Sequence, residues 1–569
     1  MIIKDRVKEL VNQAVADTGF GTVDFQVEKP KSDFGDYAVN AVFGLAKKLK
    51  KTPGEVARQL AEKISQSLPE EIEQVEAVGG YINFFLSRQY LQSALSDIAS
   101  QKNYGRSEEL KGQTVMVEYT DPNPFKLFHI GHLMSNAIGE AIARLYEAQG
   151  AKVIRANYQG DIGLHVAKAI WGTQGQLPGE SVGLAEKVKF LGAAYARGAA
   201  AYENQPETKS AIEEINEKIF NRSDPEVNRL YQIGRRWSLE YFEIIYAKLG
   251  TKFDRYFFES ETASDGLTIV RQHPDVFRES AGAIIFPGEQ YGLHNRVFIN
   301  ARGLPTYETK ELGLNKKKFE LYPELAQSLI ITGNEINEYF RVLLKTMALT
   351  IPEAAAKTRH IGHGMLRLPG GKLSSRTGEV VTAEELIEQV VGKLREIVSP
   401  KSGLSEWERE TTYEPLAISA IKYSILKQSP GHDIIFDFDK SLSIRGDSGP
   451  YLQYTYARLN SILTKAGEAA PSSNFAPDQL KEESELKLIK QLFELPNVIS
   501  ESCQKIAPQH LVLYLFELAN LANNFYEKIH IIGDENTERL TARLVLVKTT
   551  AQMLKSGLTL LGIGALEKI

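Results

Sequence analysis

The sequence predicts a multidomain α/β protein. It comprises a Rossmann-like parallel-sheet domain, an α+β domain before it and an all-α bundle after it. Three observations carry this prediction: a strand–helix–strand pattern at residues 114–157, mixed helical and strand-like patterns before it, and helical periodicity from about residue 400 onward. The expected boundaries are 1–106, 112–390 and 400–569, with a polar helical insertion at about 173–240.

The middle domain is expected to begin with a βαβ unit. Residues 114–119 form an apolar, β-branched run that Pro122 and Pro124 end. Apolar residues then recur at helical spacing over residues 133–149, and residues 152–157 predict the next strand. The loop after the first strand would lie at its carboxyl end, where open α/β sheets bind ligands.

Other elements follow from local signals. Helices are predicted over residues 5–17 and 37–49, and Thr52-Pro-Gly-Glu55 has the residues of a helix start. The run 75–85 predicts a strand of the first domain, whereas 297–300 and 328–335 predict later strands of the middle domain. In the last domain, residues 508–528 and 540–561 predict long helices. The basic cluster Lys316-Lys-Lys318 is expected to face solvent.

Composition narrows the class of protein. The chain has 569 residues, of which 43% are hydrophobic and 24% charged, and its net charge is −5. No run reaches the length of a membrane span and no signal peptide is recognised, so a cytoplasmic protein without a membrane partner is expected. The lone Cys503 excludes an internal disulfide and a cysteine zinc site. Any RNA contact must come from local basic patches.

The string His129-Ile-Gly-His132 stands between the first predicted strand and its helix. Two imidazoles and a helix N-terminus that converge there suit the phosphates of a nucleotide. Gly131 has no Cβ, so a flat base could lie close to the backbone, and Lys126 can add positive charge. The alternative is that the two histidines only cap a helix.

A second copy, His360-Ile-Gly-His363, has no predicted helix after it and is expected to be structural. It leads into Leu368-Pro-Gly-Gly-Lys372-Leu-Ser-Ser-Arg376, a Gly-rich, basic loop. Such a loop can close over a triphosphate, with Lys372 and Arg376 offsetting charge on the leaving pyrophosphate. Taken alone, it could equally be an exposed basic turn.

In this order, the first string and the basic loop resemble the HIGH and KMSKS signatures of class I aminoacyl-tRNA synthetases, although Leu373 replaces the methionine. Their surroundings resemble arginyl-tRNA synthetase. The similar segments are Asp121-Pro-Asn-Pro-Phe-Lys126 before the histidines, Tyr307-Glu-Thr-Lys-Glu311-Leu-Gly, and Gly449-Pro-Tyr451-Leu-Gln-Tyr454-Thr-Tyr-Ala-Arg458. The resemblance spans nearly the whole chain.

The resemblance implies an arginine–tRNA ligase. ATP activates L-arginine to arginyl-adenylate, and the arginyl group passes to the terminal ribose of tRNA(Arg). The implied catalytic residues are His129, His132, Lys126, Lys372 and Arg376, and the implied ATP-binding residues are His129, Gly131, His132, Lys372, Ser374 and Ser375. Arginine binding is implied for Glu118, Asn123, Asp161, Tyr307 and Glu311, and tRNA binding for Phe34, Tyr37, Asn40, Tyr451, Tyr454 and Arg458.

The first domain would then touch the tRNA elbow and the last would bind the anticodon. Tyr451, Tyr454 and Arg458 fall on one helix face, which suits unstacked bases, although ordinary core tyrosines have the same spacing. Mg²⁺ is expected to accompany ATP and not to be held by protein ligands. A monomer is expected.

The expected arginine pocket departs from the family pattern at two positions. Relatives usually have Asp at position 311 and often Gln where Ile336 stands. Glu118 and Glu311 could instead be surface acids that pair with nearby lysines.

Two other functions share part of this pattern. One is a small-molecule nucleotidyltransferase, which needs no RNA-reading bundle. The other is a non-catalytic tRNA-binding relative, which would not need His129, His132, Lys372 and Arg376.

Overall fold

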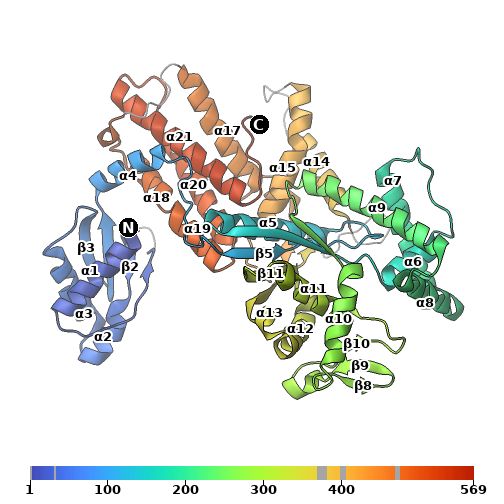
Figure 1. The fold of residues 1–569 in the computed structure, drawn as a ribbon. Helices are drawn as coiled ribbons and strands as arrows, with labels where there is room; N and C mark the ends of the chain where they lie inside the picture. The colour runs from blue at the N-terminus through green and yellow to red at the C-terminus, as the bar shows by residue number, and fades with distance from the viewer. Residues whose placement is uncertain (1–2, 31–33, 368–380, 398–404, 468–474) are drawn as a thin grey trace. The chain divides into compact units, whose positions relative to one another are not determined.

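The structure, a computed structural model, describes residues 3–30, 34–367, 381–397, 405–467 and 475–569. The chain divides into two compact units. One comprises Met1–Tyr104, Leu459–Glu494 and Asn520–Ala551, and the other comprises Gly105–Arg458, Leu495–Ala519 and Gln552–Ile569. The helical C-terminal part of the chain therefore contributes helices to both units (Figure 1).

The first unit contains an antiparallel four-stranded sheet of order β1-β2-β4-β3 and the helices packed on it. The predicted helix start at Thr52 is confirmed. Thr52 caps α3 with a capping box, since its hydroxyl accepts from the Glu55 amide and the Glu55 carboxylate accepts from the Thr52 amide. The elements are α1 (Ile3–Asp17), β1 (Val27–Glu28), β2 (Tyr37–Val39), α2 (Ala41–Leu49), α3 (Pro53–Ser65), β3 (Ile72–Val78), β4 (Tyr81–Leu86) and α4 (Arg88–Ser100).

The prediction of a helix from residue 37 was wrong for its first turn. Tyr37–Val39 forms β2, which pairs with β4, and the helix begins only at Ala41. An aromatic and a β-branched residue favour a strand, and pairing with a neighbouring strand overrides the weak helical pattern. The run 75–85 is also divided, because a turn at Gly79 and Gly80 separates β3 from β4.

The second unit is organised by a five-stranded parallel sheet of order β12-β11-β5-β6-β7 (Figure 1). Its strands are β5 (Thr114–Glu118), β6 (Lys152–Gln159), β7 (Arg255–Phe258), β11 (Leu325–Gly333) and β12 (Thr358–His363). The chain moves outward from β5 to β7, then returns to add β11 on the other side of β5. The strand order therefore reverses between β5 and β11, where open α/β sheets bind ligands.

Helices cover this sheet and carry the predicted insertion. They are α5 (Ile130–Ala148), α6 (Leu164–Gly172), α7 (Leu184–Asn204), α8 (Pro206–Asn221), α9 (Pro225–Lys248), α10 (Glu259–Gln272), α11 (Tyr307–Leu321), α12 (Asn337–Thr350), α13 (Pro352–Lys357), α14 (Ala383–Ile397), α15 (Glu406–Leu426) and α16 (Phe438–Ser441). The βαβ prediction is confirmed by β5, α5 and β6, and the region from about 173 to 240 is helical as expected.

One predicted strand lies elsewhere than expected. Arg296–Ile299 forms β10, but it pairs antiparallel with β9 (Ala283–Phe286), which pairs with β8 (Arg278–Ser280). This small sheet is separate from the parallel one (Figure 1). Antiparallel strands can be joined by a short turn, so the local sequence favours a meander over a crossover.

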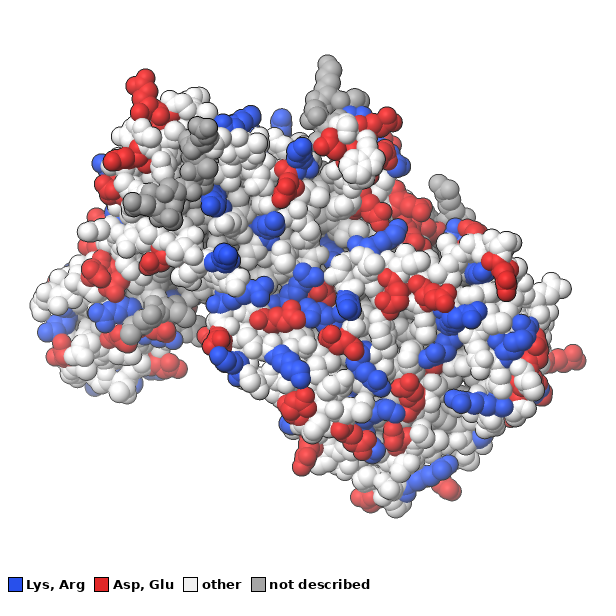
Figure 2. Space-filling model, turned by 45° about the horizontal axis from the view of Figure 1, so that its top comes forward, with Lys and Arg blue, Asp and Glu red and all other residues white. Residues whose placement is uncertain are grey.

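The C-terminal part of the chain is helical as predicted. It forms α17 (Gly449–Ala466), α18 (Glu483–Phe493), α19 (Leu495–Gln504), α20 (Gln509–Lys528) and α21 (Thr537–Leu560), and a two-residue pairing of β13 (Leu366–Arg367) with β14 (Ile434–Ile435) precedes them. Within the described ranges, no helix is long and apolar enough to cross a membrane. Basic and acidic side chains are interspersed over the face shown in Figure 2.

Candidate active site

The loop from β5 to α5 is held in a strained conformation. Thr120, Asp121 and Phe125 have φ angles of 79°, 45° and 69°, and they are three of the eight non-glycine residues with positive φ in the described part of the chain. Such strain persists only where the surroundings enforce it, and it clusters at functional sites. Here the Thr120 amide donates to the Ser135 hydroxyl at 2.9 Å, and the Phe125 amide donates to the Ser238 hydroxyl at 2.9 Å.

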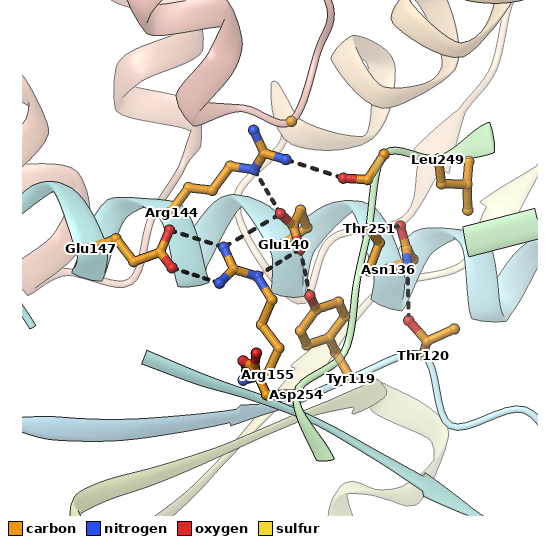
Figure 3. Close-up of polar contacts among 12 residues, drawn as sticks. Tyr119, Thr120, Asn136, Glu140, Arg144, Glu147, Arg155, Leu249, Thr251 and Asp254 are labelled. Carbon is orange, nitrogen blue, oxygen red and sulfur yellow. Dashed lines mark hydrogen bonds and ion pairs between the residues drawn. The ribbon is translucent and has the colours of Figure 1, made fainter. Parts of the chain in front are cut away.

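A polar network beneath this loop fixes α5 against the sheet (Figure 3). Glu140 of α5 accepts from the Tyr119 phenol, from Arg144 Nε at 2.6 Å and from Arg155 Nε of β6 at 3.1 Å. Burial opposes ionisation of this carboxyl, but Arg155 and Arg144 lower its pKa overall. The first turn of α5 therefore has a fixed position relative to β5 and β6.

His129 and His132 lie in that first turn. The ring centroids are 3.6 Å apart and the rings are nearly parallel. His129 Nδ1 accepts from the Gly131 amide at 3.1 Å, and His132 Nδ1 accepts from the His129 amide at 3.2 Å. Because both Nδ1 atoms accept, the ring proton of each imidazole is assigned to Nε2. A Cβ at Gly131 would lie 3.0 Å from the His129 ring, so glycine here leaves room for that imidazole.

Both imidazoles are neutral at pH 7. Burial, with a smaller contribution from Lys126, lowers the pKa of His129 to about 4. Burial and the neighbouring His129 lower the pKa of His132 well below its ordinary value. Each ring can therefore offer one neutral Nε2–H donor, and the added positive charge must come from elsewhere. Lys126 is close enough to supply it, since its charge contributes to the lowered pKa of both imidazoles. Its Nζ atom also lies 4.9 Å from the centroid of the Tyr195 ring of α7.

A cluster of buried acids lies at the carboxyl end of β5. Glu118, Asp121, Glu259 and Glu311 form this cluster, and Lys318 and Lys310 are its cations. Lys318 Nζ lies 2.9 Å from Glu118 Oε2, and both side chains are at most 1% exposed. Lys310 pairs with Glu259, again with both side chains buried.

Glu311, like Asp121, has no cation of its own among the described residues. Its Oε1 atom is buried and has no hydrogen-bond partner among the described residues. Burial first, and the charge of Glu118 second, raise the pKa of Glu311 to about 8, although Lys318 acts in the opposite direction. Burial and Glu118 also raise the pKa of Asp121 well above its ordinary value. The cluster thus has four carboxyl groups for two ammonium groups and can accept a further buried cation.

Asn123 and Tyr307 stand beside the acidic cluster. A Cβ at Gly160 would lie 2.2 Å from Asn123 Oδ1 and 3.4 Å from the Glu259 carboxyl carbon, so glycine allows the amide to approach β6. Tyr307 is 54% exposed, and Lys310 Nζ lies 4.4 Å from the centroid of its ring. The ring offers a flat, accessible surface next to the buried charges.

Comparisons with known proteins match this chain along its whole length. The profile described as tRNA synthetases class I (R), catalytic domain, matches residues 94–438; the arginyl tRNA synthetase N-terminal domain matches 3–86, and the DALR anticodon-binding domain matches 452–569. The arginine–tRNA ligase of Clostridium acetobutylicum is 31% identical over 548 residues, covering 95% of each chain. The chain belongs to the arginyl-tRNA synthetase family.

Other members of the arginyl-tRNA synthetase family are similar to this chain over its full length. The arginine–tRNA ligase of Clostridium perfringens is 31% identical over 578 residues, covering 100% of this chain and 99% of its own length. The structure of Thermus thermophilus arginyl-tRNA synthetase superposes with a TM-score of 0.79 at 27% identity, covering 100% of both chains. The Plasmodium falciparum arginyl-tRNA synthetase shares the fold, with a TM-score of 0.80 at 20% identity and coverage of 100% and 99%.

The structure brings most of the predicted small-molecule site together. Glu118, Asn123, Lys126, His129, His132, Tyr307 and Glu311 belong to the β5–α5 junction or to α11 beside it. Asp161 is different, because its carboxylate accepts from Tyr231, Arg235 and both the amide and hydroxyl of Ser260. These four bonds occupy about all its lone pairs, so Asp161 is a poor candidate for contact with arginine. Lys372, Ser374, Ser375 and Arg376 lie outside the described residues.

The residues predicted to bind tRNA differ in burial and in their contacts. Tyr451, Tyr454 and Arg458 all lie on α17, and the Arg458 guanidinium is 5.7 Å from the Tyr454 ring centroid. Phe34 is 50% exposed. Tyr37 is buried and donates its phenol proton to Glu494, so its ring is closed to a base as the structure stands. Asn40 precedes α2 and donates to Glu28 at 3.4 Å.

Sequence reasoning missed the cations of the acidic cluster and two of its acids. The expectation that Lys318 faces solvent was wrong, since its side chain is 0% exposed and pairs with Glu118. The signal was present: Glu311 and Lys318 are seven residues apart and so lie on one face of α11. No comparable signal connects Lys310 with Glu259, because these residues come from two different helices. The second histidine string forms β12 and, as expected, is not followed by a helix.

Proposed function

We propose that this protein is an arginine–tRNA ligase that uses ATP to activate L-arginine and transfers the arginyl group to tRNA(Arg). The observation that carries the choice of amino acid is the acidic cluster with its unpaired Glu311 beside the His129 loop. A guanidinium is a planar cation with five donors, and it matches carboxylates in bidentate fashion. Glu118 and Glu311 are proposed to receive it, with Tyr307 over its plane and Asn123 near the α-amino group.

The first step is proposed to occur at the N-terminus of α5. The arginine carboxylate attacks the α-phosphate of ATP, an anhydride forms and pyrophosphate leaves. The Nε2–H groups of His129 and His132 donate to the phosphate oxygens, and Lys126 adds the positive charge that the neutral rings lack. Lys372 and Arg376 are proposed to offset charge on the pyrophosphate, and Ser374 and Ser375 are proposed to bind ATP. Mg²⁺ is proposed to arrive on the phosphates of ATP, because this ion gives up its waters reluctantly and is usually bound through one or two carboxylates and substrate phosphates.

The second step transfers the arginyl group to RNA. A hydroxyl of the terminal ribose attacks the carbonyl carbon of the adenylate, and AMP leaves. The proposed anticodon-reading residues are Tyr451, Tyr454 and Arg458, and the proposed elbow-reading residues are Phe34 and Asn40. Tyr37 is proposed to support that region from inside, since its phenol is bonded to Glu494.

An ATP–pyrophosphate exchange assay, run with and without arginine and tRNA, tests the proposal. We expect exchange that requires arginine, followed by arginyl-tRNA formation. Exchange with arginine absent but another small acid present would instead indicate a small-molecule nucleotidyltransferase. Tight tRNA binding without exchange under any condition would indicate a non-catalytic RNA-binding protein.

We also propose a cytoplasmic monomer. The single cysteine, Cys503, is buried and has no second cysteine in the chain to pair with, which suits a reducing compartment. Sedimentation of the purified protein checks the oligomeric state, and a dimer at micromolar concentration would contradict this part.

A further inference from the structure

Arg144 joins the helix that carries His129 and His132 to two other parts of the chain. On α5 it lies between the Glu140 carboxylate and the segment that follows α9 (Figure 3). Its Nη2 group donates to the Gly250 carbonyl oxygen at 3.1 Å, and its Nη1 group donates to the Thr559 carbonyl oxygen at 2.8 Å. Thr559 belongs to the C-terminal segment, residues 552–569, which is part of the same compact unit. One guanidinium group therefore holds α5, the segment after α9 and the C-terminal segment together.

Lys422 of α15 makes a second junction of this kind. Its ammonium group donates to the Leu249 carbonyl oxygen at 2.6 Å and to the Gly562 carbonyl oxygen at 2.7 Å. The residue is 1% exposed, and burial lowers its pKa to about 8 against the charge of Glu140, which raises it. A buried ammonium group needs these two carbonyl groups, because burial without acceptors would be strongly unfavourable. Arg144, Lys422 and the four carbonyl groups that they hold are called the cation bridge below.

The cation bridge caps the C-terminal ends of two helices. Leu249 is the C-cap residue of α9, and Thr559 lies in the last turn of α21. Carbonyl groups at a helix C-terminus lack partners within the helix, and cations are favourable there. Gly562 has a φ of 67°, and a Cβ on it would lie 3.3 Å from Lys422 Nζ and 3.4 Å from Glu140 Cγ. Glycine at this position thus lets the C-terminal segment approach the cations closely.

The cation bridge continues into the strained loop of the active site (Figure 3). Thr251, which directly follows the bridged carbonyl groups, donates to Asn136 Oδ1 at 3.1 Å, and Asn136 donates to the Thr120 hydroxyl at 3.1 Å. The Glu140 carboxylate, which also holds the guanidinium group of the bridge, accepts from the Tyr119 phenol. The positive φ of Thr120 persists only because its surroundings enforce it, and the bridge is part of those surroundings.

We propose that Arg144 and Lys422 are positioning residues for arginine activation, through which the C-terminal segment holds the loop between β5 and α5 in its catalytic conformation. The proposal rests on the proposed function, because arginine activation is the reaction that this loop serves. Arg144 follows His132 by twelve residues on α5, roughly 18 Å along the helix axis, so it acts through the backbone that it holds and not by contact with ATP. The match of residues 452–569 to an anticodon-binding domain assigns the C-terminal segment no part in this step.

The test compares Arg144→Met and Lys422→Met in the full-length protein, since methionine keeps much of each aliphatic stem and removes the donors. Each variant should lower the kcat of arginine-dependent pyrophosphate exchange, measured with saturating tRNA(Arg), by roughly 100-fold, the scale of a misplacement of about 1 Å. The Michaelis constants for arginine and ATP should change little, because the acidic cluster and the imidazoles remain. Deuterium uptake by peptides from residues 119–132 should become faster, because the loop is held less firmly.

Two variants of the C-terminal segment separate positioning from stability. Leu558→Ala removes a buried side chain, so it should lower the melting temperature while kcat and deuterium uptake by the loop stay near wild type. Lys568→Ala removes an exposed cation that lies 3.6 Å from Glu408, and it should change none of these quantities.

Three results would overturn the proposal. They are a wild-type kcat in either methionine variant, unchanged deuterium uptake by the loop in both, and a loss of kcat in Leu558→Ala as large as theirs. Deuterium uptake requires no catalysis, so it tests the cation bridge independently of activity. A wild-type protein without arginine-dependent pyrophosphate exchange would refute the proposed function separately.

Discussion

The same four residues, His-Ile-Gly-His, occur twice in this chain with different surroundings. His129 to His132 opens α5 at the carboxyl end of the central strand, whereas His360 to His363 forms the edge strand β12. Burial lowers the pKa of both His129 and His360 to about 4, so their protonation does not distinguish them. The two histidines differ in whether their Nε2 atom has a hydrogen-bond partner within the protein. His360 Nε2 bonds Thr332 Oγ1 at 2.7 Å, whereas His129 Nε2 makes no hydrogen bond within the described residues.

The comparison teaches that the backbone around a motif decides its chemistry. At a helix N-terminus, backbone amides bond Nδ1 and leave Nε2–H to a ligand. In a strand, the amides pair with the neighbouring strand and the side chains pack within the fold, as when His360 stacks on Phe340 at 3.8 Å. A string of four letters is therefore weak information until the element that carries it is known.

The largest effect on activity is expected for a substitution in the first histidine string, and a substitution in the second should have little effect. His132→Ala is expected to lower the rate of arginine-dependent pyrophosphate exchange by roughly 10²–10³-fold, the usual cost of removing one transition-state donor. His360→Ala should keep exchange within a few-fold of wild type and lower the melting temperature. Measuring exchange and thermal unfolding for both variants checks this. Similar exchange rates in the two variants would break the comparison.

The next effect concerns the acids beside the first string. Removing one partner from a desolvated charge pair costs about 2–5 kcal/mol. Glu118→Gln and Glu311→Gln should each raise the Michaelis constant for arginine by tens-fold or more, with the constant for ATP little changed. Glu311→Asp is the control that keeps the charge. Wild-type arginine kinetics in both glutamine variants would remove these acids from the pocket.

The sequence predicts the first histidine string better than it predicts the acidic cluster beside that string. The first string was recognisable because a strand, two prolines and a helical pattern surround it within 50 residues, and local patterns of this kind are readable. The cations of the acidic cluster were not, because Glu118 meets Lys318 only after the sheet has closed, across 200 residues of chain. The small antiparallel sheet and the buried Tyr37 were missed for the same reason: contacts between distant segments decide them.

The protonation of Glu311 predicts that arginine binding depends on pH. The pKa of Glu311 is raised to about 8, so below that pH the free protein holds a proton there that a bound guanidinium must displace. Arginine binding should weaken as pH falls from about 8 toward 6, and binding at pH 7 should release close to one proton. Titration calorimetry in buffers of different ionisation enthalpy measures that proton. Glu311→Gln should show no release; equal release in both proteins would locate the proton elsewhere.

The smallest predicted effect lies far from both strings, on α17. Tyr454→Ala should raise the Michaelis constant for tRNA through the loss of one stacked base, worth about 1–3 kcal/mol, and leave the constants for arginine and ATP unchanged. The control is a tRNA(Arg) with an altered anticodon, which should be charged poorly by wild type and little worse by the variant. Unaltered charging of the anticodon-mutated tRNA by wild type would contradict a role in anticodon reading.

The central claim is that neutral imidazoles at a helix N-terminus and an acidic cluster with a free carboxyl group together make an arginine-activating site. The most direct test is the rate of aminoacyl-tRNA formation with arginine, lysine and citrulline as alternative substrates. Citrulline has nearly the same shape as arginine but no charge, so it separates charge from shape. The account predicts charging with arginine alone, and charging with citrulline at a comparable rate would contradict it.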